Sequence, residues 1–572
     1  MIGGGCEGVI LRSKERPASG FPDERSLTCE MQYTVKIMNR ALLLFLACGW
    51  AANLVVAGEG AASNCFEQAT MNAAQAQSAL TACQRYVHGW LRHADPETGL
   101  IPRNLESDRD YWNGKDAAAD NYPFMVLTAW LTERPLFDGR MREMLATETR
   151  LTSRLDNLVD AYSFTKRSWH YDEPELDRMI FESSEYSKDG LMPLTEWLGP
   201  SAWSDRMMGM IDSIWKHARV QTANGLIPSD NVEVNGEMMQ VTSRVYWMTG
   251  ERRYLEEACR LADYFLLGDK HPTRDARELK LRDHGCELIS GLTEVYVACR
   301  FAWTEKAAAY REPLHALLDR VLEVGVNEHG LMFNRVNPRT GEVLDSGLSD
   351  SWGYNYNGFY AVYLVDGEEK YRQAVLRAMG SLPEHYLQYR WEGSSADGIA
   401  DAVEGAINLF NREPVPGVAG WIDHNLERML KIQRPDGVVE GWHGDGNFAR
   451  TAIMYALWNQ QGVTIQPWRA DVRLGAVPSE EGICLSLAAD KPWRGRLAFD
   501  VPRHRKYTNL PLDYPRINQF PEWFVVDEEA RYEVRVGDGH VEMLTGMELS
   551  QGWSIELKNS QPVQISVLKI AD

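Results

Sequence analysis

Apolar side chains recur about every 3.6 residues from about residue 65 to 461, a spacing that predicts helices along this part of the chain. Seven segments keep one charged face and are predicted to be outer helices: 66–93, 138–161, 202–222, 251–267, 308–326, 369–390 and 417–432. Seven more carry apolar or small residues nearly all round and are predicted to be inner helices: 117–133, 184–198, 236–249, 285–303, 353–366, 396–411 and 446–461. The alternation predicts roughly seven helical hairpins.

A short turn, Gly-Leu-Ile or Gly-Leu-Met, recurs between these segments at 99–102, 190–193, 225–228 and 330–333, with a variant at 436–439. A loop rich in acidic residues, Asn and aromatic residues follows, and then a helix rich in small residues. A repeated unit buries its apolar face by stacking on its neighbours. Helical hairpins arranged in a ring form a toroid with a cleft at one end, so we expect function in the loops of the repeat.

The pattern changes after about residue 466. Apolar and polar residues alternate with period two at 483–487, 495–500, 532–536 and 553–557, between turns formed by Gly, Pro and Asp. This alternation predicts antiparallel strands, and about a hundred residues suffice for a small sandwich. The chain is therefore predicted to contain a toroid domain at 58–465 and a C-terminal β-sandwich at 466–572.

The first residues are predicted to lie outside the fold. Residues 1–37 show little pattern, whereas Met38-Asn39-Arg40 opens an apolar run that reaches Ala57. A basic start, an apolar stretch and small residues before Gly58 are typical of a secretory signal. We expect 1–57 to be a leader and signal peptide and the mature protein to be periplasmic or extracellular. The apolar run is too short for a convincing membrane span, so we expect no stable membrane insertion after cleavage.

Composition narrows the classes of function. At 572 residues the chain predicts two or more domains, or one large closed array. A net charge of −21 argues against nucleic-acid binding, which needs a basic face. The 19 Trp residues offer stacking platforms for flat ligands such as sugar rings, or packing between helices. Six cysteines follow the leader, and their spacing predicts no disulfide framework: Cys65, Cys83, Cys259, Cys286, Cys299 and Cys484.

The hairpin repeat followed by a β-domain resembles the six-hairpin glycosidase superfamily and the toroidal polysaccharide lyases. The resemblance covers about residues 65–572, although the predicted count of hairpins is nearer seven than six. It implies a mainly α fold, an (α/α)6–7 toroid of helical hairpins followed by a small C-terminal antiparallel β-sandwich. It also implies a carbohydrate-active enzyme whose site lies in the funnel formed by loops before the inner helices.

Five loop segments precede or open inner helices, whose N-terminal N–H groups and positive dipole ends favour carboxylates and hydroxyls. They are 111–122, 182–189, 283–287, 350–357 and 442–450. In the last two segments, Asp350 and Asp445 could each act as an acid or cap the following helix. The glycines beside His443 permit an irregular backbone there.

Another row of acidic residues falls on one helical face, at Asp397, Asp401 and Glu404. The helix around them is rich in small residues, so the row could line the cleft. Hydrogen bonding to neighbouring helix ends is the alternative for Glu404. His284 and Glu287 also share a face, but we find too few further ligands for a metal, and we expect no metal and no cofactor.

Two chemistries fit these loops. Hydrolysis of a glycosidic bond needs a pair of carboxyl groups. β-Elimination from a uronate needs a base such as Tyr or His and groups that neutralise the carboxylate. We favour hydrolysis of an oligo- or polysaccharide, because carboxylates outnumber basic groups in these loops and the overall charge disfavours a polyanionic substrate. A non-catalytic glycan-binding toroid is the third alternative.

The residue assignments follow from these chemistries. The acid and base candidates are Asp350, Glu287 and Asp445, with His443 as their assistant or as an elimination base and Tyr354 as an elimination base. Aromatic and polar residues of the same loops are predicted to bind substrate: Trp112, Asp120, Asn121, Tyr122, His284, Trp352, Asn355, Trp442 and Arg450.

Overall fold

The structure is a computed structural model that describes residues 57–479, 481–537, 539–558 and 560–570. All but the last residue of the predicted leader and signal peptide lie outside these ranges. Residues Cys65–Asp572 form one compact unit, and the description below refers to it. Among the described residues, no helix is both long enough and apolar enough to cross a membrane.

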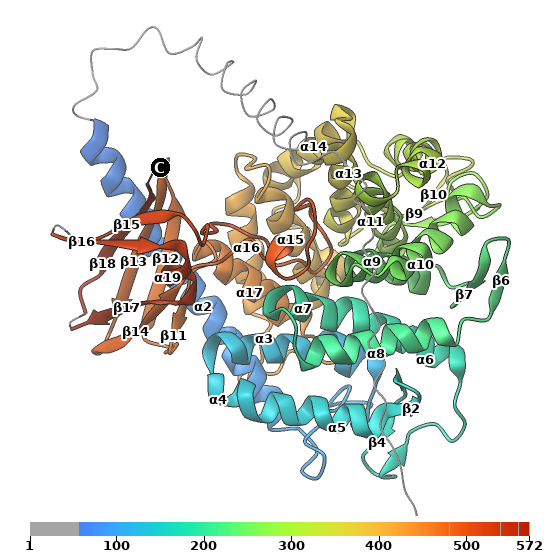
Figure 1. Ribbon diagram of the computed structural model, residues 1–572, viewed down its shortest axis with the longest axis horizontal. Helices are drawn as coiled ribbons and strands as arrows, with labels where there is room; N and C mark the ends of the chain where they lie inside the picture. The colour runs from blue at the N-terminus through green and yellow to red at the C-terminus, as the bar shows by residue number, and fades with distance from the viewer. Residues whose placement is uncertain (1–56, 480, 538, 559, 571–572) are drawn as a thin grey trace, which may run out of the picture. The chain divides into compact units, whose positions relative to one another are not determined.

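Seven inner helical stretches form the wall of a toroid in the described part of the chain (Figure 1). They are η1 (Gly114–Asn121) with α3 (Tyr122–Thr132), α6 (Leu176–Glu185) with η3 (Tyr186–Leu191) and α7 (Met192–Leu198), α9 (Val232–Thr249), α11 (Cys286–Ala302), α13 (Trp352–Asp366), α15 (Ala396–Phe410) and α17 (Asn447–Asn459). Each contacts the next along the chain, and α17 returns to contact α3. The ring is therefore closed.

Outer helices pair with the inner ones to give seven hairpins among the described residues. They are α2 (Ala57–Leu91), η2 (Phe137–Met141) with α5 (Arg142–Thr152), α8 (Ala202–Lys216), α10 (Arg252–Ala262) with η4 (Asp263–Leu267), α12 (Thr304–Val324), α14 (Glu369–His385) and α16 (Val418–Leu430). The predicted toroid of helical hairpins is confirmed. The predicted outer helix 138–161 is too long, because α5 ends at Thr152 and short strands follow.

Short elements fill the loops between the helices. The short helices are α4 (Arg134–Leu136), η5 (Asp283–Gly285), η6 (Trp391–Ser394), α18 (Arg503–Lys506) and α19 (Gly546–Gln551). The short strands are β1 (Tyr111–Trp112), β2 (Ser153–Leu155), β3 (Leu158–Val159), β4 (Tyr162–Ser163), β5 (Ser168–Trp169), β6 (Val220–Thr222), β7 (Gly225–Ile227), β8 (Leu279–Lys280), β9 (Phe333–Val336) and β10 (Val343–Leu348).

Small residues let the inner helices approach closely. A Cβ atom placed on Gly353 of α13 would lie 2.4 Å from the Cα of Gly405 on α15, so the two backbones touch at this crossing. Only glycine leaves room for such an approach. The inner helices are consequently buried nearly all round, as their composition predicts.

Two antiparallel sheets follow the toroid, at the left of Figure 1. A three-stranded sheet has the order β11 (Thr464–Gln466), β14 (Trp493–Ala498), β17 (Trp553–Leu557). A five-stranded sheet has the order β12 (Val472–Pro478), β13 (Gly482–Ala489), β18 (Val563–Lys569), β15 (Arg531–Val536), β16 (His540–Thr545). The predicted C-terminal sandwich is confirmed. The predicted boundary between residues 465 and 466 falls inside β11, and the division into two domains stays a prediction.

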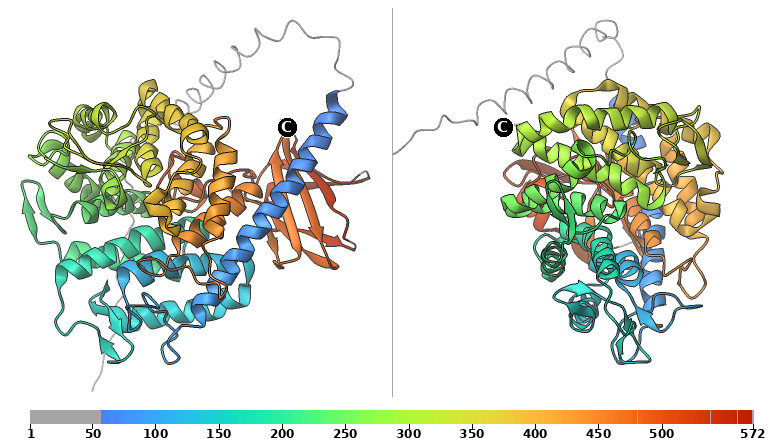
Figure 2. Two further views of the ribbon diagram at one scale, coloured as in Figure 1. Left: turned by 180° about the vertical axis from the view of Figure 1, so that it is seen from behind. Right: turned by 90° about the vertical axis from the view of Figure 1, so that its right-hand side faces the viewer.

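Two features join the sandwich to the toroid. Helix α2 runs past the strands, as Figure 2 (left) shows, and Asn72 donates to the carbonyl of Ala476 at 2.8 Å. The connection from β14 to β15 enters the toroid. In this crossover segment, residues 513–519, Tyr514 donates to Glu294 of α11 and Arg516 pairs with Glu196 of α7. The strands thus reach the inner helices directly.

Candidate functional site

A polar cavity of ≈ 330 Å³ is bounded by six of the seven inner helical stretches and by the crossover segment. Its lining residues are Lys115, Asp116, Asp120, Glu185, Lys188, Asp189, Asp283, His284, Cys286, Glu287, Ser351, Tyr354, Glu392, Asp397, Asp401, Trp442, His443, Asn447, Arg450, Ile517 and Asn518. Nine of these side chains carry a carboxyl group, against three Lys or Arg. Trp442 is 83% exposed, so its ring is free to contact a ligand.

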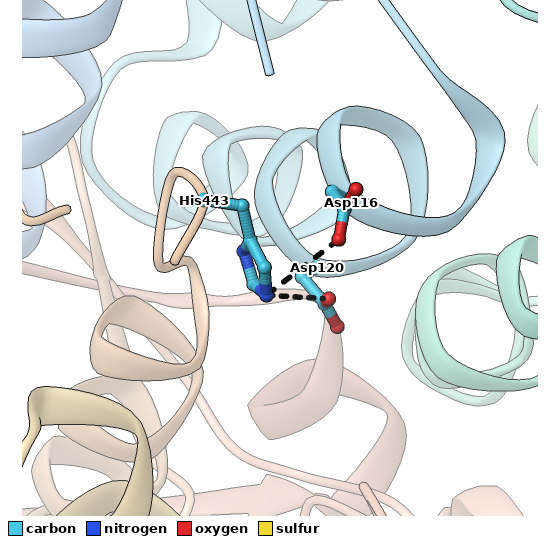
Figure 3. A group of neighbouring side chains, drawn as sticks. All are labelled: Asp116, Asp120 and His443. Carbon is cyan, nitrogen blue, oxygen red and sulfur yellow. Dashed lines mark ion pairs between the residues drawn. The ribbon is translucent and has the colours of Figure 1, made fainter. Parts of the chain in front are cut away.

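Two carboxyl groups and an imidazole meet on one wall of this cavity (Figure 3). Nε2 of His443 lies 3.8 Å from Asp116 Oδ1 and 3.5 Å from Asp120 Oδ2. One nitrogen or oxygen atom that could bind a metal, from each of the three residues, lies within 4.8 Å of the other two. Figure 3 shows both Asp side chains projecting from the same helical segment toward the His443 ring.

Segment η1 presents the two Asp side chains together. It is a π-helix, a form that often marks functional sites. The side chain of Asn113 caps it by accepting from Ala117 N at 3.0 Å, and Glu182 of α6 accepts from Gly114 N at 2.8 Å. These contacts fix the start of η1. Asp116 and Asp120 then follow four residues apart, a spacing that brings both to one side.

His443 is fixed by the loop that precedes α17. Its Nδ1 donates to the carbonyl of Gly444 at 3.0 Å, which turns Nε2 toward the carboxyl groups. A Cβ atom on Gly446 would lie 1.8 Å from the Asp120 carbonyl oxygen, and one on Gly444 would lie 2.3 Å from Asn121 Nδ2. Glycine at both positions therefore allows the loop to lie directly against η1.

The environment separates the pKa values of the two carboxyl groups. Burial pushes the pKa of Asp116 upward, but the charges of His443 and Arg103 bring it below its ordinary value. Burial raises the pKa of Asp120 to about 7, with His443 opposing the rise and Asp189 adding to it. Burial lowers the pKa of His443, but Asp120 and Asp116 raise it above its ordinary value. At neutral pH Asp116 is ionised and Asp120 is partly protonated.

Arg103 explains much of the difference. Its Nε donates to Asp116 Oδ2 at 2.5 Å, and Asn113 donates to the same oxygen at 2.6 Å. The second Asp116 oxygen, Oδ1, is the one that faces His443. Charge-assisted hydrogen bonds to a carboxylate favour its ionised form.

Across the cavity, Arg450 holds a second polar network. It pairs with Asp401 at 2.6 Å and with Glu404 at 2.6 Å, and it donates to the Tyr354 hydroxyl at 2.9 Å. The Tyr354 hydroxyl also lies within hydrogen-bond distance of Glu404 and Asp401. Burial and these carboxylates, opposed by Arg450, raise the pKa of Tyr354 well above its ordinary value. The row of acids predicted on α15 thus lies at the cavity, with Glu404 completely buried behind Asp401.

Lys188 organises a third part of the wall. Its ammonium donates to Asp189 at 2.7 Å and to Glu287 at 2.6 Å. Gln240 donates to the other Glu287 oxygen at 2.5 Å. From the crossover segment, Asn518 donates to Asp189 Oδ1 at 2.8 Å. Glu287 and Asp189 are therefore held by fixed partners.

The structure brings seven of the predicted site residues to this one cavity: Asp120, His284, Glu287, Tyr354, Trp442, His443 and Arg450. Their individual roles stay predictions. Asp350 and Asp445 do not line the cavity: Asp350 Oδ1 accepts from Ser351 N at 2.8 Å, and Asp445 Oδ1 accepts from Phe448 N, in the first turn of α17, at 3.3 Å. Burial raises the pKa of both carboxyl groups, to about 7 and about 6.

The prediction that Trp112, Tyr122 and Trp352 hold sugar rings is wrong. All three are completely buried in the apolar core, so no ring face is available to a ligand. Asn121 and Asn355, predicted to bind polar groups of the substrate, are also completely buried. Their side chains bond within the protein, Asn121 to the Tyr86 hydroxyl and Asn355 to the Leu281 carbonyl.

Several residues that line the cavity are not among the predicted catalytic or substrate-binding residues. Asp116 and Asp189 lie within the predicted loop segments. The four-residue spacing between Asp116 and Asp120 indicates in the sequence that both side chains share one side of a helix. Ile517 and Asn518 come from the β-domain, more than fifty residues after the last inner helix, and no local pattern marks them.

Two groups of side chains in the described residues have the spacing of a cation site: Asp116, Asp120 and His443, and Glu185, Glu233 and His284. In the first group Arg103 already neutralises Asp116, which leaves less need for a cation. The second group has no Lys or Arg ion pair among the described residues.

No family model and no curated protein matches the chain. The solved structures similar to it include the GH76A alpha-1,6-mannanase from Salegentibacter sp. HEL1_6 (11% identity, TM-score 0.38, covering 66% of this chain and 98% of that one). They also include a GH127 beta-arabinofuranosidase (10% identity, TM-score 0.39, covering 88% and 78%). A third is the cellobiose 2-epimerase from Bacillus thermoamylovorans B4167 (13% identity, TM-score 0.38, covering 54% and 94%).

Proposed function

We propose that the chain is a glycoside hydrolase that cleaves a glycosidic bond in an oligo- or polysaccharide, with Asp120 as the proton donor and Asp116 as its ionised partner. The proposal rests on one observation above all. Asp116 and Asp120 line one cavity, and one carboxyl oxygen of each lies within 4.8 Å of the other. The pKa of Asp116 is lowered and that of Asp120 is raised. Such a pair supplies an acid and an anion at the same pH.

The chemistry follows from the two protonation states. Asp120, with a pKa of about 7, donates its proton to the leaving oxygen as the glycosidic bond breaks. Asp116, ionised, bonds to the anomeric carbon as the leaving oxygen departs. A water molecule that gives its proton to Asp120 then displaces Asp116 and releases the sugar. One carboxyl oxygen of Asp116 lies within 4.8 Å of one of Asp120, which is nearer to the spacing of retaining hydrolases, about 5–5.5 Å, than to the wider spacing of inverting ones. His443 lies between the two groups and favours the anionic form of each.

The remaining cavity residues suit a neutral sugar. Carboxylates and amides accept and donate hydrogen bonds to hydroxyl groups, and the exposed ring of Trp442 offers a stacking face. A uronate would meet nine acidic side chains and only three Lys or Arg.

Elimination is less well supported. Tyr354, the predicted elimination base, stays protonated because its pKa lies well above the ordinary value. A non-catalytic glycan-binding toroid needs no paired carboxyl groups, whereas Asp116 and Asp120 both face His443 (Figure 3).

The test is incubation of the purified chain with a panel of neutral and uronate-containing glycans. We expect new reducing ends on a neutral glycan, without the ultraviolet absorbance of an unsaturated uronate. Absorbance rising together with reducing ends would show elimination and contradict the proposal. Binding of a glycan without any cleavage would favour the non-catalytic alternative.

A further inference from the structure

A second cluster of ligand-type side chains lies apart from Asp116 and Asp120. Glu185 ends α6, Glu233 stands in the first turn of α9, and His284 belongs to η5. One donor atom from each lies within 4.8 Å of the other two. Nδ1 of His284 pairs with Glu233 Oε1 and lies 3.6 Å from Glu185 Oε1.

The cluster forms a wall between two cavities. Glu185 lines the cavity described above, and Glu233 lines a neighbouring cavity of ≈ 370 Å³. His284 lines both, and its side chain is 51% exposed. A small solute can therefore reach the cluster from solvent.

One buried carboxyl oxygen beside the cluster has no hydrogen-bond partner among the described residues. Glu237 stands one turn after Glu233 on the same face of α9 and is only 1% exposed. Its Oε2 accepts no hydrogen bond from the residues that the structure describes. Burial of an unpaired carboxyl group is costly.

The charges of this region do not balance. Glu185 and Glu233 share one imidazole and have no Lys or Arg ion pair among the described residues, while Lys188 is already bonded to Asp189 and Glu287. In the first cluster, by contrast, a guanidinium and an imidazole accompany two carboxyl groups. A cation bound by Glu185, Glu233 and His284 would supply the missing positive charge.

The orientation of His284 fits a ligand. Its Nε2 lies 3.2 Å from Asp283 Oδ1, and its Nδ1 faces the two glutamates. A carboxylate on the far ring nitrogen is the usual way in which a metal-binding imidazole is oriented.

We propose that Glu185, Glu233 and His284 bind one divalent transition-metal ion, with the unpartnered Oε2 of Glu237 one helical turn from Glu233. Imidazole combined with carboxylates suits Zn²⁺ or Mn²⁺, whereas Mg²⁺ and Ca²⁺ prefer oxygen ligands alone. The proposed ligands do not include Asp116 or Asp120, although Glu185 and His284 border the same cavity.

The test is calorimetric titration of the chelator-treated full chain with Zn²⁺, and separately with Ca²⁺. We expect one Zn²⁺ site that Ca²⁺ does not fill at equal concentration. Glu233→Gln and His284→Ala should each abolish measurable Zn²⁺ binding, and Asp283→Asn should weaken it about 10–100-fold. Asp116→Asn, in the other cluster, should leave the Zn²⁺ affinity unchanged.

Absence of Zn²⁺ binding by the wild-type chain would overturn the proposal. So would retention of the site in both Glu233→Gln and His284→Ala, its loss in Asp116→Asn, or tighter binding of Ca²⁺. His284→Ala changes a half-exposed side chain, so circular dichroism of this variant separates loss of a ligand from loss of the fold. Loss of Zn²⁺ binding in a folded His284→Ala protein supports the site whatever the result of the glycan assay.

Discussion

Asp116 and Asp120 stand four residues apart on one helical segment and border the same cavity, yet they differ in protonation at neutral pH. The difference comes from their partners. Asp116 accepts hydrogen bonds from Arg103 and Asn113, whereas Asp120 has only the more distant His443 as an ion-pair partner among the described residues. An acid and an anion therefore arise from two identical side chains.

This difference predicts the pH dependence of activity. Asp120 must be protonated to act as an acid, so kcat/KM should fall as the pH rises through about 7. Asp116 must be ionised, and its lowered pKa should keep the acidic limb below the ordinary range of an Asp. A pH profile of kcat/KM on a neutral glycan checks both limbs. Activity that increases steadily above pH 8 would contradict the assignment of Asp120.

Activity should also depend on Gly446, because glycine at this position permits the loop that carries His443 to lie against η1. Gly446→Ala would place a methyl group 1.8 Å from the Asp120 carbonyl oxygen and displace the loop. We expect kcat/KM to fall about 100-fold, the order of loss from a misplacement of 1 Å. Gly441→Ala, in the same loop, is the matched control, since nothing lies within 4 Å of its Cβ position. Equal activity of the two variants would show that the close approach does not matter.

Part of the site could be predicted from the sequence. The acidic and aromatic residues in the segments around the starts of inner helices predict a common site. Four of the residues chosen in this way do border one cavity: Asp120, Glu287, His443 and Arg450. The burial of a side chain could not be predicted from its place in such a segment: Trp112 lies in one of them but is completely buried in the core. A Trp in a loop and a Trp in the core have the same local sequence signal.

At the scale of elements, helical periodicity gives the number and order of hairpins, because each inner helix is apolar nearly all round and each outer one is amphipathic. It predicts α5 too long, to residue 161 instead of Thr152. Asp156 adopts a positive φ of 51° in a turn between β2 and β3, so the helix stops before it. π-Helical geometry in η1 and η3, which places Asp116, Asp120 and Lys188 at the cavity, has no periodic signature either.

The contact of α13 with α15 predicts a specific sensitivity. Gly405→Ala would place a methyl group 2.6 Å from the Cα of Gly353, with backbone on both sides. Overpacking of this kind costs about 1–3 kcal/mol, so we expect a lower Tm. Gly420→Ala on the outer helix α16 has nothing within 4 Å and should raise stability slightly, as helix propensity predicts. Thermal unfolding by circular dichroism compares them; an unchanged Tm for Gly405→Ala would contradict the close packing.

At the scale of the whole unit, the crossover segment makes the strands part of the site. Asn518 bonds to Asp189, and Arg516 lies buried against Glu196. The sequence pattern distinguishes a helical part from a part made of strands. It does not predict that the crossover segment returns to the toroid, because this is a long-range contact without a local pattern. The sandwich and the toroid are therefore expected to unfold together.

Arg516→Ala tests this expectation. It leaves buried Glu196 with the more distant Arg244 and should cost about 3–5 kcal/mol, as breaking a buried ion pair does. We expect calorimetry to record one unfolding transition at a lower Tm. Arg535→Ala, an exposed change on β15, is the control and should leave Tm nearly unchanged. Two well-separated transitions in the wild-type chain would contradict the coupling.

The central claim is that Asp120 gives the leaving oxygen its proton. The most direct measurement compares Asp120→Asn with wild type on a cleaved glycan and on the dinitrophenyl glycoside of the same sugar, whose leaving group departs as a stable anion and needs no proton. Asp138→Asn, an exposed acid outside the cavity, is the control. We predict that Asp120→Asn loses at least about 100-fold on the glycan and far less on the dinitrophenyl glycoside, within the range of general acid catalysis. Equal losses on both substrates, or full activity on the glycan, would contradict the account.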